Sequence, residues 1–445
     1  MRTLLLSCFA ALLAPASAQN LVITNATIPD APGKSAVLVA GGKIVQLAEG
    51  PPRVPGRLVK LDAQGATLVA GRIDAWAEVG GNSGLGTALD AFDPYDRDFL
   101  RRAYSQGVTA LCLTPNHARD GINGLAAVIR LLPEAAKPED RVVSDASALC
   151  AGLGVGEGAL TRAQRWGELR ESFAEAKRYR EAWLDYEEEL AEYVEKLPAT
   201  AAVDSGTKPA AEAPKKRGKP EKKAAPAKDE TKKDEPKAPK QPPRDRGKDA
   251  MVRVLAREIP LRLHVERAAD VINALELAEA FDLRLVLEGG REAYLAAREL
   301  AGADVAVVLG PAIPATVTGA QPDEYARGES APRSGAGWQA LVPLRDAEDG
   351  AARLDAAGVT LAVGSGSLDA SPQVALNAGL YAAGGLAPEQ AEAAVTRTAA
   401  EVLGVGAELG RVAQGYRADL VLLDARGGVV ATVVDGRLVY RKDAP

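Results

Sequence analysis

The sequence predicts an α/β protein in which helices cover a parallel sheet, together with a small β-rich domain built from both ends of the chain. Short strand-like runs alternate with amphipathic helical runs through the middle of the 445 residues, whereas both ends carry short apolar runs separated by glycine turns. Alternation of strands and helices favours a parallel sheet, because each parallel connection crosses over as a helix. We expect the two β-rich ends to pair into one domain.

The central elements are defined by their periodicity. Ala268 to Phe281 and Arg291 to Ala301 are amphipathic, which predicts helices. Strand-like runs lie around them, at residues 107–114, 142–150, 261–265, 284–288, 305–310 and 360–364. The β-rich ends are residues 21–69 and 409–440, with turns at Gly41-Gly42 and Asp435-Gly436.

Two segments interrupt this pattern. Residues 161–197 predict a long charged helix whose aromatic and leucine residues recur mostly at steps of three and four, which indicates a packing face; partner binding is the alternative. Residues 198–249 consist largely of Lys, Pro, Ala, Glu and Asp, so we predict a disordered insert. A basic arm that touches an anionic envelope or nucleic acid is the alternative, although acidic residues dilute its charge.

The N-terminus predicts a secretory signal peptide at residues 1–18. Arg2 precedes an apolar run from Leu4 to Leu13, and Ala16-Ser17-Ala18 supplies the small residues of a cleavage site. The apolar run is about ten residues long, whereas a membrane-spanning helix needs about twenty. We therefore expect an exported protein, periplasmic or extracellular, that begins near Gln19.

Composition excludes several classes of protein. The formal net charge of −6 and an aromatic content of 4% argue against nucleic-acid binding. No second apolar run is long enough to span a membrane. Cys8 lies in the signal peptide, and Cys112 and Cys150 lie in apolar stretches, so we expect two buried thiols and no disulfide framework.

A series of motifs follows one another in a specific order. They are LVAGRID at 68–74, GVT at 107–109, TPN at 114–116 with GING at 121–124, HVERAADV at 264–271, EGGREAY at 288–294, TRTAAEVLG at 396–404 and QGYRADLVL at 414–422. Together they resemble the metal-dependent amidohydrolase superfamily, in its imidazolonepropionase-like branch. In this resemblance 107–109 begins the second barrel strand, 114–124 is the loop after it, and 264–271 contains the fifth strand.

The resemblance implies a (β/α)₈ TIM-like barrel plus a small β-sandwich domain built from both termini. The barrel would comprise residues 70–197 and 250–404, and the composite β-sandwich residues 19–69 and 405–445. Ligands would enter at the C-terminal ends of the barrel strands.

Active members of the superfamily resemble one another in a metal centre of which this chain keeps only His264. Their ligands are a His-x-His after the first strand, single histidines after the fifth and sixth strands, and an aspartate after the eighth. The corresponding residues here are Trp76, Glu78, His264, Gly289 and Gly366. Because a hydrolytic zinc site needs about three protein ligands, we expect no metal cofactor.

The residues at these positions remain candidates for a ligand pocket. Trp76 is expected to fill the space of the lost ions, while Glu78, His264 and Glu266 are hydrogen-bonded or solvated. Gly289, Ser365 and Gly366 complete the candidate pocket. A zinc site made from Glu78, His264 and Glu266 is the weaker alternative, since each pair two residues apart on a strand points to one side. His117, in a loop-like segment, is expected to be exposed.

Two classes of function follow. The favoured one is a non-catalytic binding protein for a small molecule or another exported protein. The alternative is a divergent hydrolase of non-peptide carbon–nitrogen bonds, such as those of cyclic amides, which rests on the resemblance alone. The sequence leaves the oligomeric state open.

Overall fold

The computed structural model describes residues 20–52, 59–79, 87–117, 120–133, 137–153, 159–196, 238–312 and 344–442. At its centre, eight strands form one curved, nearly closed sheet in which neighbours in space follow the chain order. They are β6 (Arg72–Glu78), β7 (Val108–Thr114), β8 (Asp120–Arg130), β9 (Val142–Leu153), β10 (Leu261–Val265), β11 (Leu285–Gly289), β12 (Ala306–Leu309) and β13 (Leu361–Val363). The predicted TIM-like barrel is therefore confirmed.

The two edge strands of this sheet meet at a seam between β6 and β13. The backbone N–H groups of Ser365 and Gly366 donate to the carbonyl oxygen of Trp76 at 3.1 and 2.9 Å. Beside them, the buried carboxylate of Asp74 accepts hydrogen bonds from the backbone N–H and the hydroxyl of Ser365 at 2.9 and 2.5 Å. These bonds hold the barrel closed.

Strand β8 departs from a regular (β/α)₈ barrel. It pairs antiparallel with both β7 and β9, so seven of the eight strands run in one direction and β8 runs against them. The expectation that residues 121–124 form a loop is wrong, since they lie within β8. Gly121 and Gly124 have positive φ, and the pairing of β8 with β9 shifts register beside them. A register shift of this kind lets a strand continue past residues whose backbone is not extended.

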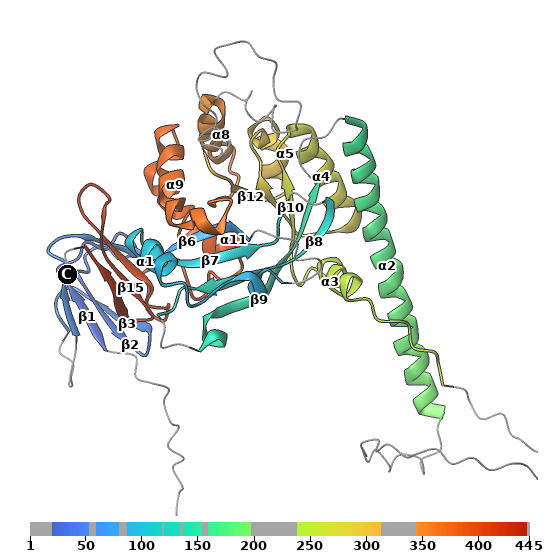
Figure 1. Ribbon diagram of the computed structural model, residues 1–445, viewed down its shortest axis with the longest axis horizontal. Helices are drawn as coiled ribbons and strands as arrows, with labels where there is room; N and C mark the ends of the chain where they lie inside the picture. The colour runs from blue at the N-terminus through green and yellow to red at the C-terminus, as the bar shows by residue number, and fades with distance from the viewer. Residues whose placement is uncertain are drawn as a thin grey trace, which may run out of the picture.

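Helices cover the outside of the barrel, as Figure 1 shows. The α-helices are α1 (Arg97–Ser105), α2 (Ala159–Lys196), α3 (Arg246–Leu255), α4 (Ala268–Phe281), α5 (Ala297–Gly302), α8 (Leu344–Ala356), α9 (Val374–Ala383), α10 (Pro388–Ala393) and α11 (Arg397–Val402). Short 3₁₀ helices are η1 (Ala88–Ala91), η2 (Pro138–Arg141), η3 (Ala293–Ala296) and η4 (Leu368–Gln373). Apolar side chains of these helices and of the strands form one large core.

Both termini contribute to a small β-domain at one end of the molecule (Figure 1). One sheet, in the order β3-β2-β1-β4, contains β1 (Leu21–Thr24), β2 (Ala36–Ala40), β3 (Lys43–Ala48) and β4 (Val59–Asp62). The other, in the order β16-β15-β14-β5, contains β5 (Thr67–Ala70), β14 (Leu420–Leu423), β15 (Val429–Val434) and β16 (Arg437–Arg441). Ile23, Leu68 and Leu420 share the core between them, so the predicted β-domain is present.

A buried ion pair joins the β-domain to the barrel. The guanidinium of Arg130, at the end of β8, donates twice to the carboxylate of Asp419 at 2.7 Å. It also lies 3.2 Å from Asp435. Arg130 and Asp419 have side chains only 4% exposed, so their geometry fixes the angle between the two domains.

Helix α2 lies at the end of the molecule opposite the β-domain (Figure 1). The first half of its apolar stripe is a packing face, in which Phe173 is fully buried; from Tyr179 onward the stripe is only partly buried, and the Tyr179 hydroxyl donates to Asp249 at 2.8 Å. Arg244 lies 5.0 Å above the Trp183 ring, so residues 238–245 run beside this helix before α3 begins. Residues 1–18 and 198–237, which hold the predicted signal peptide and most of the predicted insert, are outside the described residues. Residues 246–249, the end of the predicted insert, instead form the start of α3, so the prediction of disorder is wrong there.

No helix among the described residues is long and apolar enough to cross a membrane. Cys112 and Cys150 are buried free thiols, as expected, and burial raises the pKa of Cys112 to about 11. Neither thiol is suited to act as a nucleophile near neutral pH.

Candidate functional site

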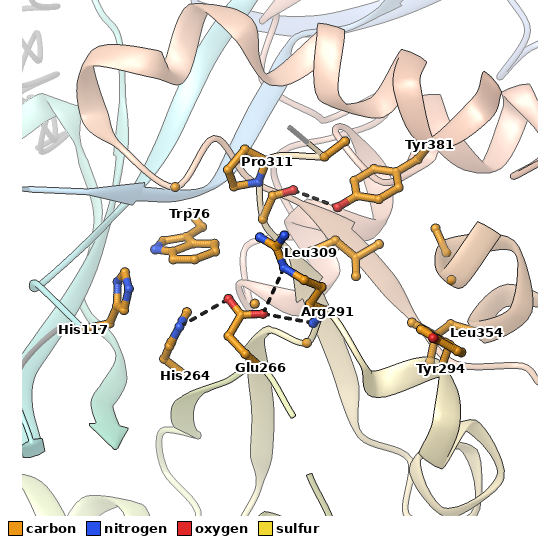
Figure 2. A pocket seen from close by; sticks show the side chains of 17 residues that line it. Trp76, His117, His264, Glu266, Arg291, Tyr294, Leu309, Pro311, Leu354 and Tyr381 are labelled. Atoms are coloured by element: carbon orange, nitrogen blue, oxygen red, sulfur yellow. Dashed lines mark hydrogen bonds and ion pairs between the residues drawn. The ribbon is translucent and has the colours of Figure 1, made fainter. Parts of the chain in front are cut away.

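A cavity of about 160 Å³ opens where the strands β6, β10, β11, β12 and β13 end. Parallel barrel strands present their C-terminal ends on one side, so side chains far apart in sequence meet there. Figure 2 shows Trp76, His117 and His264 on one side of this cavity and Leu309, Leu354 and Tyr294 on the other. The cavity thus has a polar half and an apolar half.

The two histidines of the chain lie against each other in the polar half. The rings of His117 and His264 stack with centroids 3.8 Å apart. Trp76 packs against both, with centroid distances of 5.5 Å to His117 and 5.3 Å to His264. His117 follows β7 and His264 belongs to β10, so the antiparallel strand β8 and strand β9 lie between their strands in the sheet.

A carboxylate faces each histidine. The carboxylate of Glu78 is hydrogen-bonded to Nδ1 of His117. Oε1 of Glu266 lies 3.5 Å from Nε2 of His264, and its Oε2 accepts the backbone N–H of Arg291 at 3.0 Å. The guanidinium of Arg291 lies 4.0 Å from the same oxygen.

A second ion pair lies deeper in the barrel. The guanidinium of Arg262 is ion-paired with Glu288, and both residues are almost fully buried. Arg262 also donates to the carbonyl oxygen of Ala75 at 2.6 Å and lies 3.4 Å from the sulfur of Cys112. A permanent positive charge is therefore built into the barrel interior beneath the cavity.

Burial and charge give the two histidines opposite pKa shifts. Burial lowers the pKa of His264 well below its usual value, and the charges of His117 and Arg262 act in the same direction. Burial also opposes protonation of His117, but the hydrogen bond and charge of Glu78 outweigh it and raise the His117 pKa. Burial raises the pKa of Glu266 and of Glu288, against the neighbouring guanidinium groups.

Trp76 is accommodated by glycines on the facing strands. It is 3% exposed. A Cβ added at Gly310 would lie 2.7 Å from the Trp76 ring, and a Cβ added at Gly364 would lie 2.3 Å from the Cβ of Trp76. Its indole Nε1 and Nδ1 of His264 are buried without a hydrogen-bond partner among the described residues. These two polar atoms are therefore buried without the hydrogen bond that such atoms usually make.

The structure brings together five of the seven residues proposed from the sequence. Those that line the cavity are Trp76, His264, Glu266, Gly289 and Gly366. Glu78 instead stands behind His117, and Ser365 is bound to Asp74 at the barrel seam.

The expectation that His117 is exposed is wrong. Its side chain is 22% exposed, because it packs between Glu78 and His264. Sequence reasoning also missed Arg262 and Glu288. Their signal was present: each is a charged residue within an apolar strand, in Leu261-Arg262-Leu263 and Leu287-Glu288, and charges are rarely buried unless they are paired.

The metal centre that the superfamily uses does not fit these residues. Gly289 has a φ of +90°, and a Cβ there would lie 2.8 Å from Oε1 of Glu266 and 2.9 Å from Cε1 of His264. Gly366 has a φ of +73°, and a Cβ there would lie 3.0 Å from the ring of Pro311. The backbone at the sixth- and eighth-strand positions therefore resists any side chain, not only the histidine and aspartate that metal binding needs.

Comparison with known proteins shows which fold this chain shares. The model of the amidohydrolase family matches residues 346–439. An amidohydrolase from Thermotoga maritima superposes with a TM-score of 0.69 and 22% identity, over 95% of this chain and all of the other. A prolidase in complex with N-methylphosphonate-L-proline superposes with a TM-score of 0.52 and 16% identity, over 95% of this chain and all of the other.

No curated protein matches this chain. The fold is nevertheless that of the amidohydrolase with which the chain superposes, and the family model supports the resemblance at the level of the superfamily. The imidazolonepropionase-like branch stays a prediction. Since fold alone does not establish activity, function must be argued from the cavity.

Proposed function

We propose that this chain is a binding protein that keeps the amidohydrolase fold without its hydrolytic metal centre. The observation that carries this proposal is the state of the sixth- and eighth-strand ligand positions, Gly289 and Gly366. Both have positive φ, and neighbouring atoms occupy the space of a Cβ, so the structure disfavours a side chain at either position. Trp76 occupies a third position and is packed between glycines.

The charges around the cavity support the same proposal. Arg262 supplies a fixed buried cation that is paired with Glu288. Two metal ions in the same barrel would be repelled by this charge, which cannot be released because arginine stays protonated. The charge of Glu288 is therefore already balanced by the protein itself.

The cavity favours a small ligand with one polar and one apolar side. Its volume of about 160 Å³ has room for roughly five waters, below the usual range of drug-sized pockets. His117, Glu266 and Arg291 line the polar half and would contact the polar side of the ligand. Leu309, Leu354 and Tyr294 would contact a short apolar group.

The test compares binding with turnover for the same compounds. Small carboxylates, cyclic amides and N-acyl amino acids are titrated into the mature protein by calorimetry, then incubated with it, with and without added zinc, and analysed for hydrolysis. We expect binding without turnover, and weaker binding to the Leu354→Trp variant, which narrows the apolar half. Turnover by the wild type would contradict the proposal.

The second candidate is a divergent hydrolase of carbon–nitrogen bonds. One observation favours it: His117, His264 and Glu288 each offer a ligand atom, and these atoms lie within 4.8 Å of one another. Hydrolysis that requires zinc and disappears in His264→Ala would establish this candidate in place of the first.

Export is part of the proposal. The N-terminal segment supports it, since it has the charge, apolar run and small residues of a signal peptide. Expression of the full chain in a Gram-negative host should place the protein in the periplasm with an N-terminus near Gln19. An unprocessed chain retained in the cytoplasm would rule this out.

A further inference from the structure

The inner end of the cavity carries a set of donors different from the one that the superfamily uses. Two of its members, His117 after β7 and Glu288 on β11, are not at the family's ligand positions. We propose that His117, His264 and Glu288 bind one divalent transition-metal ion, with zinc as the preferred probe. This inference goes beyond the proposed function, because it concerns an ion and not the small ligand.

The first step is the orientation of the two imidazoles. Nδ1 of His117 is taken by the carboxylate of Glu78, so its Nε2 is the nitrogen left for an ion. Nε2 of His264 lies 3.5 Å from Glu266, so Nδ1 is the nitrogen left on that ring. A carboxylate on the far nitrogen fixes the tautomer of a metal-binding histidine and raises its basicity.

An independent observation points to a ligand at this place. Nδ1 of His264 is buried, and it has no hydrogen-bond partner among the described residues. The residue is only 5% exposed. A buried polar atom without a partner costs free energy, and coordination of an ion would satisfy it.

The geometry and the donor types agree with a single small ion. One ring nitrogen of each histidine and one carboxylate oxygen of Glu288 lie within 4.8 Å of one another, whereas bonds of about 2.1 Å place two ligands at most about 4.2 Å apart. Because the two rings stack with centroids 3.8 Å apart, both imidazoles would turn out of the stack when their lone pairs converge on the ion. Two histidines and one glutamate form a known zinc donor set that leaves a fourth position open, and imidazole disfavours magnesium and calcium.

The charge balance allows one ion and disfavours two. Three carboxylates surround the place, namely Glu78, Glu266 and Glu288, and two guanidinium groups face it from Arg262 and Arg291. One divalent ion changes this excess of one negative charge into an excess of one positive charge. Arg262 bonds to Oε2 of Glu288, which leaves the other carboxylate oxygen for the ion.

The experiment titrates zinc and cobalt into the chelator-treated mature protein. We expect one ion per chain by calorimetry, and cobalt absorption bands of the intensity typical of four-coordinate sites. His117→Ala should weaken binding at least tenfold. Glu78→Gln, which removes no ligand atom, should weaken it by about 10- to 100-fold. Glu408→Gln, in an exposed ion pair with Arg417, is the matched control and should bind as the wild type does.

The outcomes separate this inference from the proposed function. No saturable zinc binding, two ions per chain, or unchanged affinity in His117→Ala would each overturn the single-ion site. His117 is partly exposed, so its alanine variant should fold, and a circular dichroism spectrum equal to that of the wild type checks this. Calorimetry with small carboxylates in the presence of chelator tests the binding function alone.

Discussion

Asp74 is a fully buried carboxyl group at the seam between β6 and β13. Burial raises its pKa to about 6, although hydrogen bonds from Ser365 and the backbone of Trp76 oppose the rise. Its folded-state pKa therefore lies above the unfolded value of about 3.9. The folded chain binds a proton between pH 6 and pH 4 that the unfolded chain does not, so this group favours folding more strongly as the pH falls through that window.

The prediction follows for Asp74→Asn, which cannot ionise. The stability of the wild type relative to this variant should rise by up to about 3 kcal/mol when the pH falls from 7 to 4, since each pKa unit corresponds to about 1.4 kcal/mol. Urea unfolding of both proteins at several pH values measures the difference. If the stability difference between the two proteins is constant with pH, or falls on acidification, the pKa of Asp74 is not raised in the folded protein.

Gly289 offers a second test at the residue scale. Gly289→Ala adds a Cβ close to Glu266 and His264 at a backbone with φ +90°, whereas Gly121→Ala adds one at φ +74° with open space around it. Strain at positive φ costs about 1 to 3 kcal/mol in both variants. We expect Gly289→Ala to be less stable than Gly121→Ala by a further 1 to 2 kcal/mol in urea unfolding. Equal stabilities would mean that the site can accept a side chain.

Sequence reasoning located half of the site. Trp76 and His264 were predicted because they stand at the ligand positions of the superfamily, and Glu266 because it lies two residues from His264 on the same strand. His117 was missed because its partner His264 lies across two intervening strands, and no local spacing encodes that contact. Arg262 was missed because a charged residue in an apolar strand has no recognisable partner until the register of β10 and β11 is known.

At the scale of elements, the strands were largely predictable, and so was the shared direction of seven of the eight barrel strands; the reversed direction of β8 was not. The predicted run at 261–265 is β10, and the predicted helix Ala268 to Phe281 is α4. Strand β8 was not foreseen, because its glycines resemble a loop and its apolar residues belong to an antiparallel hairpin. Periodicity identifies an element by itself, whereas direction depends on contacts with its neighbours.

The joint between β8 and the β-domain gives a prediction about elements. Arg130→Met would leave the buried carboxylate of Asp419 without its guanidinium, which typically costs about 3 to 5 kcal/mol. Arg417→Met is the control, because Arg417 pairs with Glu408 near the surface, where such pairs contribute about 0 to 1 kcal/mol. Thermal and urea unfolding measure both losses. A small effect of Arg130→Met would mean that water reaches Asp419.

For the whole molecule, the resemblance predicted the barrel and the composite β-domain correctly because their motifs keep their order along the chain. Strand β5 pairs with β14 across more than three hundred residues, and that pairing follows from the family pattern and not from local sequence. The insert interrupts the barrel between β9 and β10, which are nevertheless adjacent and parallel. The insert therefore leaves the pairing of the two strands that flank it intact.

Limited proteolysis tests this view of the insert. Residues 198–237 contain many lysines and almost no large apolar side chain, so trypsin should cut there first. The two fragments should stay associated in native chromatography, because β9 pairs with β10 and Lys248 lies 3.0 Å from Glu175 of α2. Deletion of residues 198–237 should change the melting temperature by only a few degrees, since loop length affects stability weakly. The insert would be a structural part of the barrel if trypsin cut α2 earlier than the insert, if the fragments separated, or if the deletion variant unfolded.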